Sequence, residues 1–180
     1  MPEKVKTDLG FADLQCRKSD VGRISRIAKA AYSFNRRFFG KEIKKPFHII
    51  ICYSRKEFDD IWGAETDAWL TGFATKTGTI VSFRDDLIRK YNPRKEATLA
   101  GTLRHEINHI FYFQIYGSYE PAWLLEGLTL QPPFEPFTLM ENDKKRLKGP
   151  LPHLIYSTNG KTFFKQAPFL YSMAFLATRH

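Results

Sequence analysis

The amino-acid sequence predicts an α+β fold, and three observations support this prediction. A short apolar run at residues 47–53 is rich in β-branched side chains and is typical of a buried strand. Two further β-rich runs, at residues 70–75 and 79–83, flank a glycine-containing turn and predict a hairpin that pairs with that strand. Long helical patterns cover residues 19–39 and 93–116. We expect a small sheet of three or four strands packed on helices.

The length and composition favour one folded domain. The chain has 180 residues, and 43% of them are hydrophobic, which excludes a disordered chain. We expect a single domain over residues 1–180, in which residues 1–18 form a loose N-terminal arm. Residues 131–180 are expected to form a helical C-terminal subdomain, although the proline-rich segment 131–137 cannot be regular helix.

The net charge of +9 allows a nucleic acid, an anionic membrane or an acidic substrate as partner. No nucleic-acid motif accompanies the charge, so a basic, solvated surface is the preferred interpretation. Cys16 and Cys52 have no zinc or redox spacing. No signal peptide and no transmembrane segment is visible, so a cytoplasmic protein is expected. The sequence does not indicate an oligomeric state.

Helix boundaries follow from capping residues. Ser19 or Asp20 is expected to cap the first long helix, and Gly40 to end it. Ser54 and Glu57 form a capping box that begins a short helix after the first strand.

The second long helix carries the motif with the clearest chemistry. It is expected to begin at Asn92-Pro93 and to end at Tyr116. Within it, His105-Glu106-Ile107-Asn108-His109 matches HExxH. Side chains four residues apart lie on one helix face, so both imidazoles can bind one metal ion. Glu106 lies one position round the helix and can act on a metal-bound water without being a ligand.

A catalytic zinc site also needs a third protein ligand and an open position for water. Tyr112 and Ile115 stand where the metzincin pattern has Gly and His, and both cysteines precede the motif. Glu126 fits, because it lies on a helix predicted at residues 121–128, after a turn through Gly117. Two antiparallel helices joined in this way can bring one carboxylate to the two histidines.

The HEINH motif and the run Pro-Ala-Trp-Leu-Leu-Glu-Gly-Leu at residues 121–128 together resemble a known family, the gluzincin metallopeptidases. They are closest to the peptidase MA-like branch, in which HExxH and a short spacer precede an apolar-Trp-Leu-x-Glu-Gly-Leu run. The likeness covers residues 45–130, and residues 160–180 match more loosely. The matching residues of the second run are Trp123, Leu124, Glu126, Gly127 and Leu128. The resemblance implies a zincin-like fold, in which a small mixed β-sheet packs on the zinc-binding helix and a helical C-terminal part follows.

The resemblance also implies a function, a zinc-dependent metalloendopeptidase acting on a peptide or protein. His105, His109 and Glu126 would bind one catalytic Zn²⁺, and Glu106 would be the general base that activates the zinc-bound water. Tyr171, in the loosely matching segment, is the candidate oxyanion stabiliser, with a purely structural aromatic as an equal alternative.

Three further residues are candidates for binding the substrate. Thr79, Ile80 and Val81 are expected to accept the substrate backbone as an added strand. His153 and Tyr156 are weaker alternatives to Tyr171 as the oxyanion stabiliser.

One departure from the family pattern concerns the orientation of the first histidine. Better-known gluzincins carry an acidic residue one turn after the third ligand, where this chain has Leu130. Another group, such as the neighbouring Thr129, would then have to orient the imidazole.

Three alternatives to a general peptidase remain. The chain could be a latent or inactive gluzincin-like zinc-binding protein, or a regulatory protease that cuts one protein partner. A basic nucleic-acid-binding domain with a structural HEINH is less favoured; it predicts no bound metal and strongly salt-dependent binding.

Overall fold

The computed structural model describes residues 3–92, 94, 97–118 and 122–129. The chain divides into two compact units, Met1–Tyr116 and Gly117–His180, which are described separately below. The features expected at residues 131–180 lie outside the described residues. No helix in the described part of the chain is long and apolar enough to cross a membrane.

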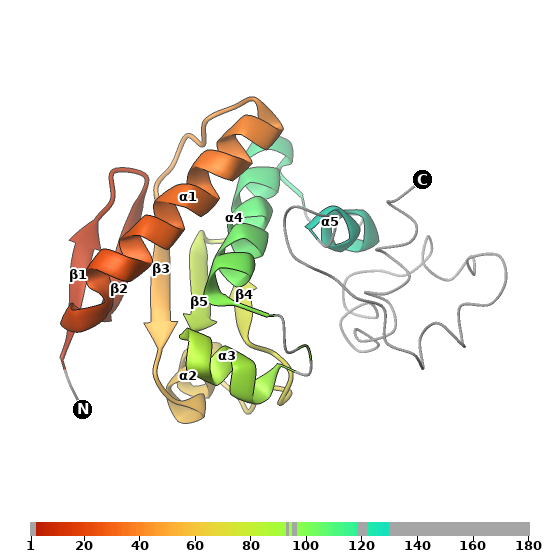
Figure 1. The fold of residues 1–180 in the computed structure, drawn as a ribbon. Coiled ribbons are helices and arrows are strands. Elements are labelled where there is room, and N and C mark those ends of the chain that lie inside the picture. Colours follow the sequence, from red (N-terminus) through yellow and green to blue (C-terminus); the bar gives the residue numbers. More distant parts are fainter. Residues whose placement is uncertain (1–2, 93, 95–96, 119–121, 130–180) are drawn as a thin grey trace, which may run out of the picture. The chain divides into compact units, whose positions relative to one another are not determined.

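The first unit combines strands and helices along its whole length (Figure 1). Its elements are, in order, β1 (Lys4–Asp8), β2 (Ala12–Arg17), a 3₁₀ turn (Lys18–Asp20), α1 (Val21–Phe39), β3 (Phe47–Cys52), α2 (Arg55–Trp62), β4 (Gly72–Ala74), β5 (Thr79–Phe83), α3 (Asp85–Tyr91) and α4 (Leu99–Tyr116). In the second unit the structure describes one helix, α5 (Ala122–Thr129).

The five strands form one mixed sheet in the order β1-β2-β3-β5-β4. The pairs β1–β2 and β4–β5 are antiparallel, and the pairs β2–β3 and β3–β5 are parallel. This confirms the predicted α+β class, the hairpin of β4 and β5, and its pairing with β3. The sheet has five strands where three or four were expected.

The additional strands come from the N-terminal segment, so the prediction of a loose arm over residues 1–18 is wrong for the described part of that segment. Ala12, Leu14 and Cys16 alternate with polar residues, and all three are buried in the core. This period of two is typical of a strand with one face on the core. The polar residues between them make the segment look like a solvated arm by composition alone.

The first two predicted helix boundaries are confirmed at their caps. Helix α1 ends at Phe39, and Gly40 follows in the left-handed conformation with φ 61°. At α2, the side chain of Ser54 accepts a hydrogen bond from the backbone N–H of Glu57. Asp20 is the N-cap residue of α1, but its side chain makes no capping bond. Its Oδ2 accepts a hydrogen bond from the hydroxyl of Tyr53 at 2.8 Å.

The predicted start of the second long helix is wrong, because α4 begins at Leu99 and not at Asn92-Pro93. Asn92 is instead the C-cap residue of α3 and has an extended backbone. In sequence, a proline just after a helix end is common. Thr98 caps α4 by accepting a hydrogen bond from the N–H three residues later, at 3.1 Å. The end at Tyr116 is as predicted, and Gly117 follows with φ 73°.

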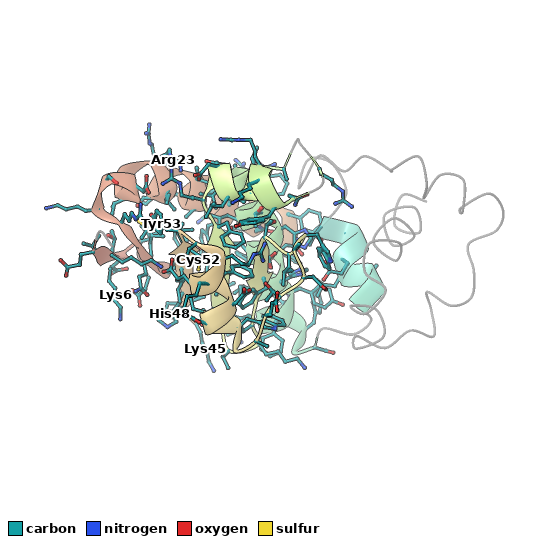
Figure 2. The ribbon with its side chains drawn as sticks, turned by 90° about the horizontal axis from the view of Figure 1, so that it is seen from below. Lys6, Arg23, Lys45, His48, Cys52 and Tyr53 are labelled. Atoms are coloured by element: carbon teal, nitrogen blue, oxygen red, sulfur yellow. The ribbon has the colours of Figure 1, made fainter. Side chains whose placement is uncertain are left out.

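Helices α1 and α4 pack against each other and lie over the same face of the sheet (Figure 1). Helix α4 also contacts β4 and β5, and α1 contacts β2. Helix α4 buries an apolar stripe in the core, namely Leu99, Leu103, Ile107, Ile110 and Phe111. Figure 2 shows Arg23 on the α1 side of this unit and His48 on the opposite side of the sheet.

Candidate metal centre

Helix α4 carries its HExxH motif in a buried setting. His105, Glu106 and His109 are only 8%, 6% and 6% exposed. Ionisable side chains are rarely buried to this extent without a strong partner or a metal ion. The two imidazole rings have centroids 4.6 Å apart and planes at 89°. The helix therefore places both imidazoles on one face, as their spacing predicts.

Another side of α4 is joined to α1 by two buried asparagines. Asn108 donates a side-chain hydrogen bond to Oδ1 of Asn35 at 3.2 Å. Asn35 in turn donates to the backbone oxygens of Arg104 and Ala31, each at 3.0 Å. Because both asparagines are fully buried, these bonds stabilise one rotation of α4 about its axis and so set the direction of its histidines.

The importance of Asn35 was not anticipated from the sequence. A usable signal was present, because Asn35 continues the buried stripe of α1 that contains Ile24, Ala28 and Ala31. A polar residue on the apolar face of an amphipathic helix needs a buried partner.

Asp85, another residue not anticipated, holds the N-terminus of α4. Its Oδ1 accepts the N–H of Leu99 at 2.8 Å, and its Oδ2 pairs with Arg23 of α1. Burial favours a higher pKa for Asp85, but the hydrogen bonds from Leu99 and Arg23, with the charge of the arginine, outweigh it. The pKa of Asp85 is therefore lowered from its ordinary value of 3.8. A carboxylate here is also favoured by the dipole of α4.

Strand β4 passes close to the motif, and Gly72 makes this approach possible. A Cβ atom at Gly72 would lie 2.5 Å from Cγ2 of Thr102 and 3.5 Å from Oε1 of Glu106. Only glycine brings the strand backbone this near to α4 without a clash. In the part of the sheet that the structure describes, β4 is also an outer strand.

Arg55 of α2 holds the loop that leads into β4. Its guanidinium donates to the backbone oxygens of Ala68 at 2.8 Å and Leu70 at 3.1 Å. The same group lies over the rings of Phe83 and Tyr91, at 4.7 and 4.3 Å from their centroids. These contacts link the loop to α3 and β5, and they help to position β4.

The prediction that a substrate backbone adds to the strand at Thr79, Ile80 and Val81 is wrong. These residues belong to β5, which pairs with β3 on one side and β4 on the other. The backbone N–H and oxygen of Thr79 both bond to Thr75. A strand paired on both sides has no free edge, so a peptide cannot add to it. The outer strand nearest the motif is β4 instead.

Helix α5 of the second unit covers the predicted helix 121–128 to within one residue at each end. Glu126 is 3% exposed. The hydroxyl of Thr129, considered above as a group that orients a histidine, donates a 2.8 Å hydrogen bond to the backbone oxygen of Glu126. Four other predicted or discussed positions lie outside the described residues, namely Leu130, His153, Tyr156 and Tyr171.

The predicted metal ligands form a group that could hold a metal ion. One ligand atom each from His105, His109 and Glu126 lies within 4.8 Å of the other two. Two imidazoles and one carboxylate are a donor set found in catalytic zinc sites. The same donors also suit other first-row divalent ions, so the donor chemistry fits zinc without being restricted to it.

Comparisons with protein-family models, with curated proteins and with solved structures find no match to this chain. The structure establishes an α+β fold with a five-stranded mixed sheet. A zincin-like fold and a peptidase activity therefore stay predictions, which rest on the residues and chemistry of this chain alone.

Proposed function

We propose that this protein is a zinc-dependent metallopeptidase of the gluzincin type. The observation that carries the proposal is the buried group of His105, His109 and Glu126, whose ligand atoms lie within 4.8 Å of one another. A HExxH motif that arises by chance in a helix needs no third metal ligand near it. A catalytic zinc site does need one. The presence of Glu106 between the two histidines supports hydrolysis rather than a purely structural ion.

In this proposal the chain's own residues have separate roles. When bound, zinc would polarise a peptide carbonyl and lower the pKa of a water molecule to about 7. Glu106, on the same buried turn of α4, accepts a proton from the attacking water and delivers it to the leaving amine. Asn35, Asn108 and Asp85 hold α4 in place, so they are positioning residues.

We also propose that the substrate is a peptide or protein in extended conformation that adds to the outer side of β4. Gly72 of β4 lies beside Glu106, and the strand order supports an accessible edge there. Backbone hydrogen bonds along an edge strand give affinity with little dependence on side chains. Because β4 has only three residues, the added pairing is short and the sequence preference is expected to be broad.

Metal analysis of the purified full chain tests the ligand set. We expect about one zinc per chain in the wild type and strong loss in Glu126→Ala. Glu65→Ala is the matched control, since it removes an exposed carboxylate of the same type and should retain zinc. Zinc absent from the wild type, or retained equally in Glu126→Ala, would show that the ligand set is wrong.

Hydrolysis of a denatured protein tests the reaction. Glu106→Gln should retain zinc and lose activity by roughly 10²- to 10⁴-fold, the usual contribution of a general base. Activity that survives in Glu106→Gln would remove Glu106 as the base. A zinc-loaded wild type without activity would indicate a latent or inactive zinc-binding protein. Cleavage of only one native protein partner would indicate a regulatory protease. A metal-free chain with strongly salt-dependent binding to nucleic acid would favour the basic nucleic-acid-binding domain.

A further inference from the structure

A second candidate site lies between α1 and α4 in the first unit. It is an open pocket of about 310 Å³. Its lining consists of three arginines and four apolar side chains, namely Arg23, Arg26, Arg104, Ile27, Ala30, Ala31 and Ala100. None of the residues in this lining is acidic. Figure 2 shows Arg23 on the α1 side of the unit.

The pocket follows from small side chains at the crossing of two helices. Ala30 and Ala31 of α1 and Ala100 of α4 are too short to fill the groove between the helices. Residues three or four positions apart share a helix face, so Arg23 and Arg26 stand above the same stretch of groove. The result is an apolar floor with a rim of three arginines, of which Arg23 has its charge balanced by Asp85.

Each arginine of the rim is held by a neighbouring group. Arg23 pairs with Asp85, and Nε of Arg26 donates to the backbone oxygen of Gly22 at 3.2 Å. The guanidinium of Arg104 lies 4.8 Å from the centroid of the Phe34 ring. Restricted guanidinium groups lose less conformational entropy when they bind an anion. The rim is therefore partly preorganised for a ligand.

The pocket is separate from the candidate metal group on α4. Arg104 directly precedes His105, and one residue step turns a helix by about 100°. Arg104 and Ala100, four residues apart, consequently share a face that differs from the face of the two histidines. A ligand in the pocket would contact a different side of the same helix.

We propose that this pocket binds a small organic anion with an apolar body and a phosphate or carboxylate head. The volume is at the lower end of the range for ligand pockets, about 300–1,000 Å³. Guanidinium groups bind the two oxygens of a phosphate or carboxylate in parallel, and they remain charged at all physiological pH values. The alanine and isoleucine floor favours a ligand whose remainder is hydrocarbon. This site is independent of the proposed peptidase activity.

Calorimetric titration of the full chain with hexyl phosphate, hexanoate and inorganic phosphate tests the site. At least one of the two alkyl anions should bind about tenfold more tightly than inorganic phosphate, because its chain is removed from water on the apolar floor. The stronger of the two identifies the preferred head group. Arg26→Gln should weaken its binding by about tenfold, because a charge-assisted hydrogen bond is lost.

Two variants distinguish a pocket from general surface charge. Arg37→Gln removes an exposed positive charge from the same helix but outside the lining, and it should bind like the wild type. Ala30→Leu keeps every charge but fills the floor, and it should lose most of the alkyl-anion binding. Thermal melting of each variant shows whether it is folded.

Several results would overturn the proposal that this pocket binds an organic anion. These are no binding of either alkyl anion to the wild type, equal losses in Arg26→Gln and Arg37→Gln, or unchanged binding in Ala30→Leu. An oligonucleotide that binds more tightly than the alkyl anions, and is weakened equally by both arginine substitutions, would assign the charge to a nucleic-acid surface and also overturn it.

Discussion

Buried polar side chains on α4 and around it distinguish this chain from an ordinary apolar core. Asn35, Asn108, His105 and Glu106 are all nearly or completely removed from solvent. Each such group costs free energy unless a partner compensates its lost hydration. The hydrogen bond between Asn108 and Asn35 is such a partner contact. Substitutions of these buried polar residues therefore test what holds α4 in position.

The asparagine pair should show strong energetic coupling. Asn35→Ala leaves the Asn108 amide and the Arg104 carbonyl without this partner and opens a cavity, so we expect a loss of about 2–4 kcal/mol in the free energy of unfolding. Urea denaturation measures it. In Asn35→Ala/Asn108→Ala the loss should be smaller than the sum of the single losses.

A distant site provides the control for this coupling. Ser54→Ala, which removes the cap of α2, should add to Asn35→Ala without coupling. Additive losses for the two asparagines would show that their hydrogen bond does not stabilise the contact of α1 with α4.

Gly72 should tolerate no side chain while Thr102 keeps its methyl group. In Gly72→Ala the new Cβ would lie 2.5 Å from Cγ2 of Thr102, so we expect a destabilisation of about 1–3 kcal/mol by overpacking. Urea denaturation again gives the magnitude. Thr102→Ser removes that methyl group and should restore most of the lost stability in the double variant. A Gly72→Ala chain as stable as the wild type would contradict the close approach of β4 to α4.

At the level of elements, α4 is stabilised at both its N-terminus and its flank. Thr98 caps the first turn, Asp85 accepts the N–H of Leu99, and Asn35 contacts the helix further along. The cap residue and two other elements, α3 and α1, thus determine where α4 begins and how it is rotated. Asn92 makes none of these three contacts, so it was a poor guide to the start of α4.

Asp85 should make the stability of this helix depend on pH. Its pKa is lowered in the folded state, so its contribution is complete above its ordinary value of 3.8 and is lost as the pH falls through the lower, folded value. Between about pH 5 and about pH 2, the wild type should therefore lose more unfolding free energy than Asp85→Asn. Urea denaturation at several pH values measures this difference.

The matched control for this pH dependence is Asp60→Asn, which changes an exposed carboxylate paired with Lys56 on α2. Its pH dependence should follow that of the wild type, because exposed ion pairs contribute little. If the unfolding free energies of Asp85→Asn and the wild type run parallel below about pH 4, this would contradict the role of Asp85 at α4.

For the molecule as a whole, bound metal should contribute to stability. A ligand that binds only the folded chain stabilises it by about 3–4 kcal/mol when its free concentration exceeds Kd by roughly 100- to 1,000-fold. If the proposed site is correct, a chelator should lower the melting temperature of the zinc-loaded wild type and leave His109→Ala unchanged. His48→Ala, which alters an exposed histidine of β3, should respond to the chelator like the wild type.

An equal response of His109→Ala to the chelator would show that any stabilising ion binds elsewhere. No response in the wild type, together with one zinc per chain by metal analysis, would show that binding does not favour the folded state. Both outcomes are separable from a missing peptidase activity, because melting does not require turnover.

The local features of this protein were predictable from its sequence. Gly40 ends α1, Ser54 caps α2, and the spacing of His105 and His109 places both on one face of α4. The choice of Glu126 as the third donor also agrees with the group that the structure brings together. These features depend on residues a few positions apart, whose geometry the helix itself determines.

Two predictions, the loose N-terminal arm and the start of α4, were wrong because a local sequence signal has two possible meanings. The alternating Ala12, Leu14 and Cys16 already signalled β2, but the polar residues between them hid it. Asn92-Pro93 predicts a helix start, although the same residues also suit a helix end. In both cases the local sequence allowed two structures, and packing against the sheet selected one.

Only the tertiary structure decided which strand is outermost, which residues hold α4 and where a pocket forms. Strand order makes β5 internal and β4 an outer strand of the described sheet, which moved the proposed substrate edge to Gly72–Ala74. The contacts of Asn35 with α4 and of Asp85 with Leu99, and the groove lined by Arg26, join residues far apart in the chain. Periodicity determines which face of a helix or strand is apolar, because it is set within a few residues. The partner that covers each face is determined by packing of the whole chain.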